Sequence, residues 1–192
     1  MKKEQNQRIM LTKRLLKDAL LRLLEDSAIQ KISVTQLCEE AGINRATFYR
    51  HYGSQYDVLN EMEMTMLEDI ESMLGESCPT DLNAFQKQAE LICVYLREHS
   101  SEAKLFFGNT GIGSDFEEKL FSHVKWQSIL ERFCDPTLDA SQKELILAFW
   151  QNGFFSLLRQ WLVADIPLKP DAVARLMLRI AMSGLELNSG AE

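Results

Sequence analysis

Apolar residues recur along this chain at spacings of three and four, the period of an α-helix with one buried face. Over residues 7–26, for example, Leu16, Ala19, Leu20 and Leu23 fall on one side. No segment shows the alternating pattern of a β-strand, and the chain contains no internal repeat. The pattern therefore predicts an all-α protein.

Polar segments, several of them containing Gly or Pro, separate about nine such helices. We predict them at residues 7–26, 33–40, 44–52, 55–74, 81–98, 101–107, 115–133, 140–164 and 171–187. The first three or four are expected to form a compact head. This organisation predicts one domain at residues 1–53 and a larger one at 54–192, with the helix at 55–74 linking the two.

The second and third helices carry clear start and stop signals. Ser33 and Gln36 form a capping box before the second helix, and Gly42 can take the positive φ of a tight turn after it. Asn44 is a suitable N-cap for the third helix. Two short helices joined in this way predict a helix-turn-helix.

Apolar and polar residues of this unit separate into two sets. Leu37, Ala41, Ile43 and Phe48 have the spacing to fasten the helix pair to the first helix. The outer face of the third helix then carries polar groups that can bind phosphates or base edges, namely Arg45, Thr47, Tyr49, Arg50 and His51. The alternative is an ordinary solvated surface helix, but such a cluster directly after a glycine turn favours a recognition helix.

Residues 33–59, SVTQLCEEAGINRATFYRHYGSQYDVL, resemble the DNA-binding signature of TetR-family transcriptional regulators. The matching positions are Gly42, Ile43, Thr47, Phe48, Tyr49, His51 and Tyr52. The resemblance implies a helix-turn-helix head on a helical regulatory and dimerisation body. The expected DNA contacts are Ser33, Thr35, Arg45, Ala46, Thr47, Tyr49, Arg50, His51 and Gln55.

Gln55 departs from the family pattern, which has a phosphate-binding lysine at the start of the fourth helix. Glutamine can donate a hydrogen bond but releases no counterion from DNA. We therefore expect a salt dependence of DNA binding that is shallower by about one unit of slope.

Charge is unevenly distributed along the chain, whose net charge is −7. Residues 1–60 hold ten Lys and Arg against seven Asp and Glu, whereas residues 61–192 hold eleven against twenty-one. A basic head on an acidic body is compatible with a polyanionic partner. The chain has no apolar run of about 20 residues and no signal-peptide core, so we expect a cytoplasmic protein with no membrane partner.

The chain shows no catalytic or metal-binding motif. Its four cysteines are far apart without a Cys-x-x-Cys pair, which favours reduced and mostly buried thiols. His99 and His123 have no partner residue visible in the sequence, and no Ser/His/Asp or Cys/His set has a recognisable context. We expect neither a metal nor a cofactor, and no enzymatic activity.

Residues 144–161 are too apolar for a helix with one wet face. We expect Leu145, Phe149, Phe155 and Leu158 to face the core, which leaves a second apolar side. By resemblance, that side and the last helix form a dimer interface of Trp150, Gly153, Phe154, Leu157, Met177, Ile180, Ala181 and Gly184. The alternative is packing within one chain.

By the same resemblance, the middle helices enclose a small-molecule pocket coupled to the head. Phe106, Phe107, Trp126 and Phe133 are candidate lining residues, and plain core aromatics are the alternative for each. The acidity of the body is compatible with a cationic or neutral guest, although it also suits an ordinary soluble surface.

The main hypothesis is a ligand-responsive, homodimeric repressor that binds a near-palindromic operator in double-stranded DNA. Its small-molecule effector is unknown. The alternative is a TetR-fold protein-interaction factor, such as a coactivator or a nucleoid-associated factor, with weak or no DNA binding.

Overall fold

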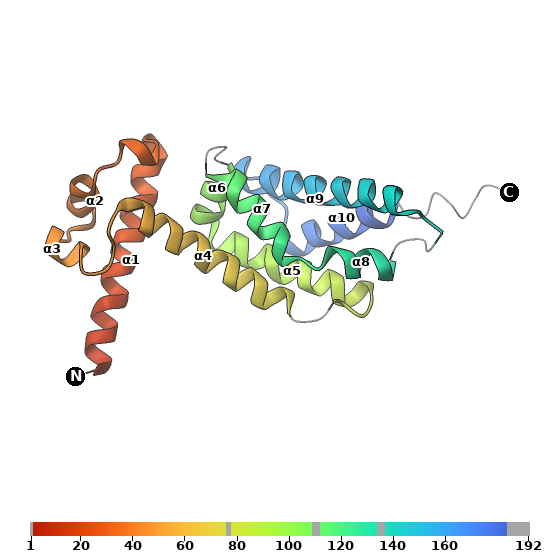
Figure 1. The fold of residues 1–192 in the computed structure, drawn as a ribbon, viewed down its shortest axis with the longest axis horizontal. Helices are drawn as coiled ribbons and strands as arrows, with labels where there is room; N and C mark the ends of the chain where they lie inside the picture. The colour runs from red at the N-terminus through yellow and green to blue at the C-terminus, as the bar shows by residue number, and fades with distance from the viewer. Residues whose placement is uncertain (1, 76–77, 109–111, 134–136, 184–192) are drawn as a thin grey trace. The chain divides into compact units, whose positions relative to one another are not determined.

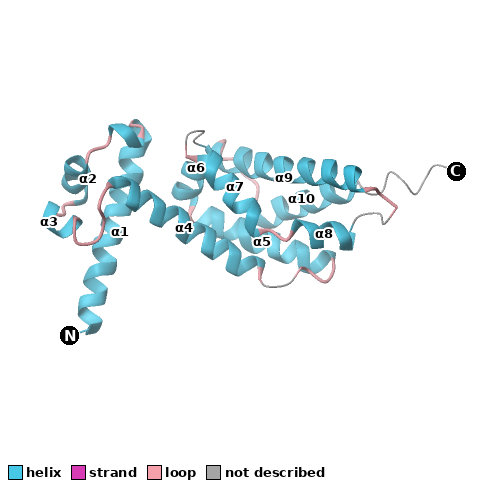
Figure 2. Ribbon diagram, in the orientation of Figure 1, coloured by secondary structure: helices cyan, strands magenta, loops and turns pink. Residues whose placement is uncertain are grey.

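The computed structural model describes residues 2–75, 78–108, 112–133 and 137–183, and these residues form helices without any strand (Figures 1 and 2). The elements are α1 (Lys2–Asp26), the 3₁₀ helix η1 (Ile29–Lys31), α2 (Val34–Ala41), α3 (Arg45–Phe48), α4 (Gln55–Leu74), α5 (Leu82–Glu98), α6 (Ser100–Gly108), α7 (Gly113–His123), α8 (Trp126–Phe133), α9 (Ala140–Val163) and α10 (Pro170–Ser183). The all-α prediction is confirmed. In the described part of the chain, no helix is long and apolar enough to cross a membrane.

The chain divides into two compact units, Met1–Met66 and Leu67–Glu192, and α4 begins in the first and ends in the second. The boundary predicted after residue 53 lies just before α4, whereas the two compact units divide within α4, between Met66 and Leu67. In the first unit, Leu16, Leu20, Leu37, Phe48 and Val58 are fully buried. Apolar faces of α1, α2, α3 and α4 therefore share one core.

The caps of the second helix are those that the sequence predicts. The side-chain oxygens of Ser33 and Gln36 each accept the other residue's backbone N–H in a capping box. Gly42 ends α2 with φ 66° and ψ 28°, a conformation in which a Cβ would be strained. These local signals fix the length of α2 and the direction of the chain that leaves it.

The second unit is a bundle in which α10 packs against α5, and α9 packs against α6. Its core includes stacked aromatic rings: the ring centroids of Phe106 and Phe116 are 5.1 Å apart, and those of Phe107 and Phe155 are 4.7 Å apart. Burial of these rings contributes much of the apolar stabilisation of the unit.

The predicted single helix over residues 115–133 is wrong, because the structure forms α7 and α8 there. Val124, between them, has the extended backbone angles φ −83° and ψ 130°. Neither Gly nor Pro marks this break in the sequence, so the described residues hold ten α-helices in place of about nine.

Three of the four cysteines lie in the described residues. Cys38 and Cys93 are buried, Cys78 is half-buried, and all three are free thiols. The described residues contain no cluster of three or more His, Cys, Asp or Glu that could hold a metal ion.

Candidate functional site

Hydrogen bonds at the start of α3 and just beyond its end fix its position. The Asn44 side chain accepts a hydrogen bond from the Thr47 N–H at 2.7 Å and so caps the helix. Beyond α3, the N–H groups of His51 and Tyr52 donate to the Phe48 carbonyl at 2.9 and 3.0 Å. The regular helix thus ends at Phe48 instead of near Tyr52, but the chain continues in a helical turn.

Side chains of this turn separate sharply into buried and exposed sets. Phe48 is fully buried and Tyr52 is 5% exposed, whereas Tyr49 is 51% exposed. Burial raises the pKa of the Tyr52 hydroxyl first, and the neighbouring Glu61 carboxylate raises it further. Phe48 and Tyr52 therefore anchor the turn, and Tyr49 belongs to its outer face.

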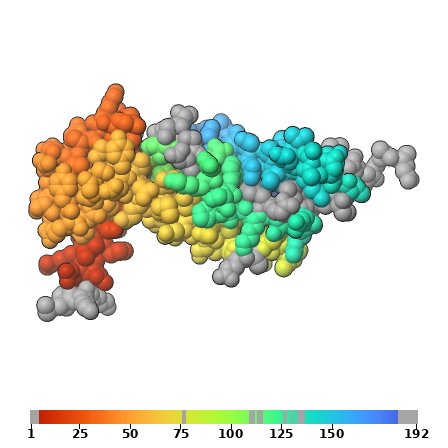
Figure 3. Space-filling model, in the orientation of Figure 1, coloured from red at the N-terminus to blue at the C-terminus, as the bar shows by residue number. Residues whose placement is uncertain are grey.

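All nine residues expected to contact DNA have side chains at least partly exposed to solvent. Ser33, Thr35, Arg45, Ala46, Tyr49 and Arg50 are exposed, and Thr47, His51 and Gln55 are half-buried. They come from α2 and its N-cap, from α3 and the following turn, and from the start of α4; α2 packs against α3. In the space-filling view, the orange segment that contains α2 and α3 forms part of the outer surface of the first unit (Figure 3).

The arginines of this face differ from several other basic residues of the first unit. Arg45 lies over the Tyr49 ring at 5.8 Å from its centroid, and Arg50 donates to the Thr47 hydroxyl at 3.2 Å. Among the described residues, neither arginine forms an ion pair with a carboxylate. Both guanidinium charges are thus available to an external anion.

Several other cations of the first unit are neutralised internally. Lys13 and Lys17 contact the two carboxylate oxygens of Glu61 at 2.6 and 3.0 Å, and Arg22 contacts Glu40 at 2.6 Å. Burial opposes ionisation of Glu61, but the hydrogen bonds from both lysines outweigh it and lower the pKa of the carboxyl. Arg45 and Arg50 are thus among the cations of the first unit that no carboxylate of the described residues neutralises, as are Arg8 and Lys31.

The entry to α4 depends on hydrogen bonds to Asp57. One Asp57 oxygen accepts the N–H groups of Gly53 and Ser54 at 2.7 and 3.1 Å. A Cβ at Gly53 would lie 3.1 Å from this oxygen, so glycine permits the close approach. This arrangement places Gln55 as the first residue of α4.

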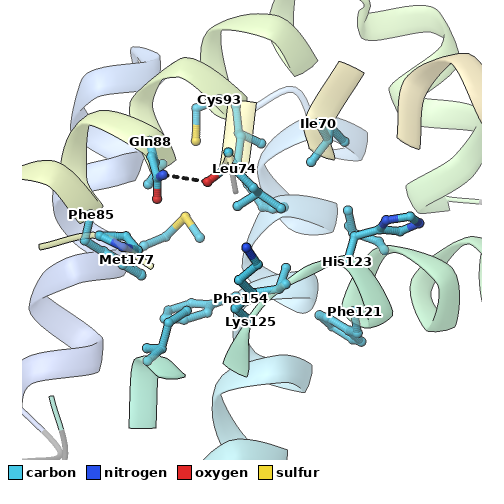
Figure 4. A pocket seen from close by; sticks show the side chains of 18 of the residues that line it. Ile70, Leu74, Phe85, Gln88, Cys93, Phe121, His123, Lys125, Phe154 and Met177 are labelled. Carbon is cyan, nitrogen blue, oxygen red and sulfur yellow. Dashed lines mark hydrogen bonds between the residues drawn. The ribbon is translucent and has the colours of Figure 1, made fainter. Parts of the chain in front are cut away.

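An apolar cavity of about 120 Å³ lies within the second unit (Figure 4). It is lined by residues of α4, α5, α7, α8, α9 and α10, including Ile70, Leu74, Phe85, Ile92, Cys93, Leu120, Phe121, Ile129, Phe154 and Met177. Gln88 donates to the Leu74 carbonyl at 2.7 Å and ties α5 to the end of α4. Burial, with a smaller contribution from Glu90, raises the pKa of the Cys93 thiol to about 12.

The lining differs from the one proposed from the sequence. Phe106 and Phe107 are fully packed in the aromatic core and do not line this cavity. The side chains of Trp126 and Phe133 lie outside the described residues. A sequence signal for the observed lining is the stripe of Phe85, Gln88, Ala89 and Ile92 at helical spacing on α5.

A second apolar hollow runs along α9 and α10, with Phe149, Gly153, Leu157, Leu176 and Ile180 among its lining residues. Leu145 and Phe149 are 73% and 63% exposed, so the expectation that they face the core is wrong. Phe155 and Leu158 are buried as expected. On the same side of α9, which packs on its own unit, the other buried residues are Trp150, Phe154, Trp161 and Leu162.

The residues proposed for a dimer interface fall into a buried group and a group that is still exposed. Trp150, Phe154, Met177 and Ala181 are already buried within the chain, whereas Gly153, Leu157 and Ile180 retain exposed surface. Gly184 lies outside the described residues. A Cβ at Gly153 would meet no atom within 4 Å, so a neighbour can approach this position closely.

Comparisons with known proteins agree with this arrangement. Over 167 residues, the chain is 21% identical to an uncharacterized HTH-type transcriptional regulator, YxbF of Bacillus subtilis, covering 83% of this chain and 42% of that protein's length. A TetR transcriptional regulator from Streptococcus agalactiae has a TM-score of 0.68 at 18% identity, over 94% of this chain and 99% of the other. SmeT, the repressor of the Stenotrophomonas maltophilia multidrug efflux pump SmeDEF, has a TM-score of 0.65 at 10% identity, over 90% and 89%.

Family assignments cover both units. Residues 83–183 match the family described as transcriptional regulator C-terminal region, and residues 16–62 match bacterial regulatory proteins of the tetR family. The second match contains the whole of α2, α3 and the turn that follows. These are families of transcriptional regulators and not of enzymes. The chain therefore belongs to the TetR family of transcriptional regulators, with an N-terminal helix-turn-helix and an all-α body.

Proposed function

We propose that this protein is a ligand-responsive, homodimeric repressor that binds a near-palindromic operator. It acts in the cytoplasm, where its DNA target is accessible. The observation that carries the proposal is the outer face of α3 and of the turn that follows it. There Arg45 and Arg50 have no carboxylate partner among the described residues, and Tyr49 is half exposed. Such a face combines phosphate-binding charge with side chains that can reach base edges.

Dimerisation is supported by the apolar surface of α9 and α10. Exposed large side chains, among them Leu145, Phe149, Leu176 and Ile180, lie on these two helices. Exposure of several large apolar residues on neighbouring helices is typical of a protein interface. A two-fold dimer presents two copies of α3, and its operator accordingly contains two related half-sites.

Ligand response is supported by the position of α4. Its first part, through Val58 and Met62, belongs to the core of the first unit, while Ile70 and Leu74 line the cavity of the second. A ligand in the cavity contacts the same helix that carries Gln55 at its other end. A ligand that prefers the conformation with poor DNA complementarity then lowers operator affinity, by about 5- to 150-fold for a coupling of ~1–3 kcal/mol.

Selection of bound fragments from a random DNA pool tests the proposal. We expect enrichment of a near-palindrome with half-site centres about 34–36 Å apart or at a multiple of that spacing. Recovery of no related sequences would reject the repressor and favour the alternative, a TetR-fold interaction factor. Gln55 is the observation that favours this alternative, because it removes one expected cationic phosphate contact.

A further inference from the structure

The cavity of the second unit has a charge pattern opposite to that of the whole protein. The chain has 28 acidic residues and a net charge of −7. Even so, none of the described residues that line the cavity is Asp or Glu. Its charged or titratable polar lining consists of His123, Lys125 and the thiols of Cys78 and Cys93.

The two basic side chains of the cavity are not equivalent. His123 Nδ1 lies 3.3 Å from a carboxylate oxygen of Glu71, so the imidazole already has a partner within the chain. Lys125 has no carboxylate or carbonyl partner for its ammonium group among the described residues. Lys125 is an exposed residue that lines the cavity, and Figure 4 shows the end of its side chain toward Leu74.

The break between α7 and α8 accounts for the position of this lysine. The extended backbone at Val124 ends α7, and the Lys125 carbonyl then accepts the Ile129 N–H at 3.1 Å at the start of α8. Val124, Lys125 and Ile129 all line the cavity. In an uninterrupted helix Lys125 and Ile129, four residues apart, would already share a face, and Val124 would lie about 100° away from Lys125. The extended backbone at Val124 allows this residue to line the same cavity.

We infer that the effector of this protein is a small amphipathic anion, with an apolar body in the cavity and a carboxylate or similar acidic group on Lys125. This inference rests on the proposed ligand-responsive function and specifies the chemistry of its ligand. A cationic guest would lose its hydration against a lining that offers no carboxylate, which is costly. An anionic guest meets the one cation of the described lining that has no partner, and it forms a charge-assisted hydrogen bond there.

The size of the cavity limits the apolar body. A cavity of about 120 Å³ is somewhat smaller than the roughly 150 Å³ apolar cavity that holds a benzene ring. The buried part of the ligand is therefore about the size of one small ring or a short alkyl chain. Hexanoate, hexanol and hexylamine form a suitable probe series, because they share this alkyl body and differ in the charge of the head group.

Calorimetric titration of the protein with these three probes tests the inference. We expect hexanoate to bind most tightly and hexylamine most weakly. Lys125→Met should weaken hexanoate binding by about tenfold or more and leave hexanol binding nearly unchanged, as expected for the loss of one charge-assisted hydrogen bond. Lys125→Arg should retain the preference for the anion, and Lys125→Glu should reverse it in favour of the amine.

Lys87→Met is the matched control, because Lys87 is an exposed residue of α5 that does not line the cavity. Equal or tighter binding of hexanol or hexylamine, no binding of any probe, or an unchanged preference in Lys125→Met would overturn the inference.

Operator affinity is measured separately with each probe. If hexanoate binds through Lys125 without lowering operator affinity, the ligand chemistry stands and the ligand-responsive function fails. If a neutral or cationic probe releases the operator, the function stands and the anion inference fails.

Discussion

Phe48 and Tyr49 are adjacent in sequence and their rings meet edge to face, with centroids 5.4 Å apart, yet Phe48 is fully buried and Tyr49 is half exposed. The pair divides α3 into an inner face that holds the head together and an outer face that is free to bind. This division makes the effects of the two side chains separable by mutation.

Replacement of Phe48 by Ala should destabilise the protein, whereas replacement of Tyr49 by Ala should not. Phe48→Ala leaves a cavity and is expected to lower the free energy of unfolding by ~3–5 kcal/mol. Tyr49→Ala should change it by less than about 1 kcal/mol and weaken operator binding. Thermal unfolding and fluorescence anisotropy measure the two effects, and equal thermal destabilisation by both variants would show that the faces of α3 are wrongly assigned.

The turn between α2 and α3 should tolerate Gly42 substitutions in a graded order. Because φ is 66° at this position, Gly42→Ala should cost ~1–2 kcal/mol of stability. Gly42→Asn should cost less, since Asn adopts this conformation more readily, and Gly42→Val should cost more. A Cβ here meets no atom within 4 Å, so the order reports backbone strain and not a clash. Equal unfolding midpoints for the Asn and Val variants would contradict this explanation.

Substitution of Gln55 by Lys should restore a phosphate contact at the start of α4. The slope of log K against log salt for operator binding is expected to steepen by about one unit. Asn83→Lys adds the same charge at an exposed position of α5 and serves as the control. Equal slopes for the wild type and Gln55→Lys would place residue 55 away from the DNA backbone.

The α9–α10 surface should control the oligomeric state. Ile180→Glu introduces a charge at a position that is 38% exposed, and it should shift sedimentation from dimer toward monomer. Gly153→Leu should act in the same way, because the single chain has room for the side chain but a close partner helix does not. Leu91→Glu, at an exposed apolar position of α5, should remain dimeric. A monomeric wild type would remove the basis of this interface.

The head was predictable from the sequence because its signals are local. Ser33, Gln36, Gly42 and Asn44 each act on backbone groups within a few residues, and the structure confirms each of these roles. The face of a short helix follows from spacing alone, which is why the exposed and buried sets around Phe48 are those expected.

The body was less predictable because its helices are apolar on several sides. In α9, spacing alone does not decide whether Phe149 or Trp150 faces inward, and only the packing against α6 and its neighbours fixes the choice. The cavity combines residues of six helices, and the break at Val124 has no Gly or Pro signal. Its lining therefore depends on tertiary packing rather than on any local pattern.

The central claim is that the outer face of α3 recognises a specific DNA sequence. Its most direct test is the ratio of affinities for the selected operator and for a scrambled duplex of the same length, measured by fluorescence anisotropy at one fixed salt concentration. We predict a ratio of about 10³ or more for the wild type, typical of specific DNA-binding proteins. The double variant Arg45→Ala, Arg50→Ala should lose most of this ratio while its unfolding temperature stays close to that of the wild type. A wild-type ratio near one, or an unchanged ratio in the double variant, would contradict the assignment of α3 as the recognition element.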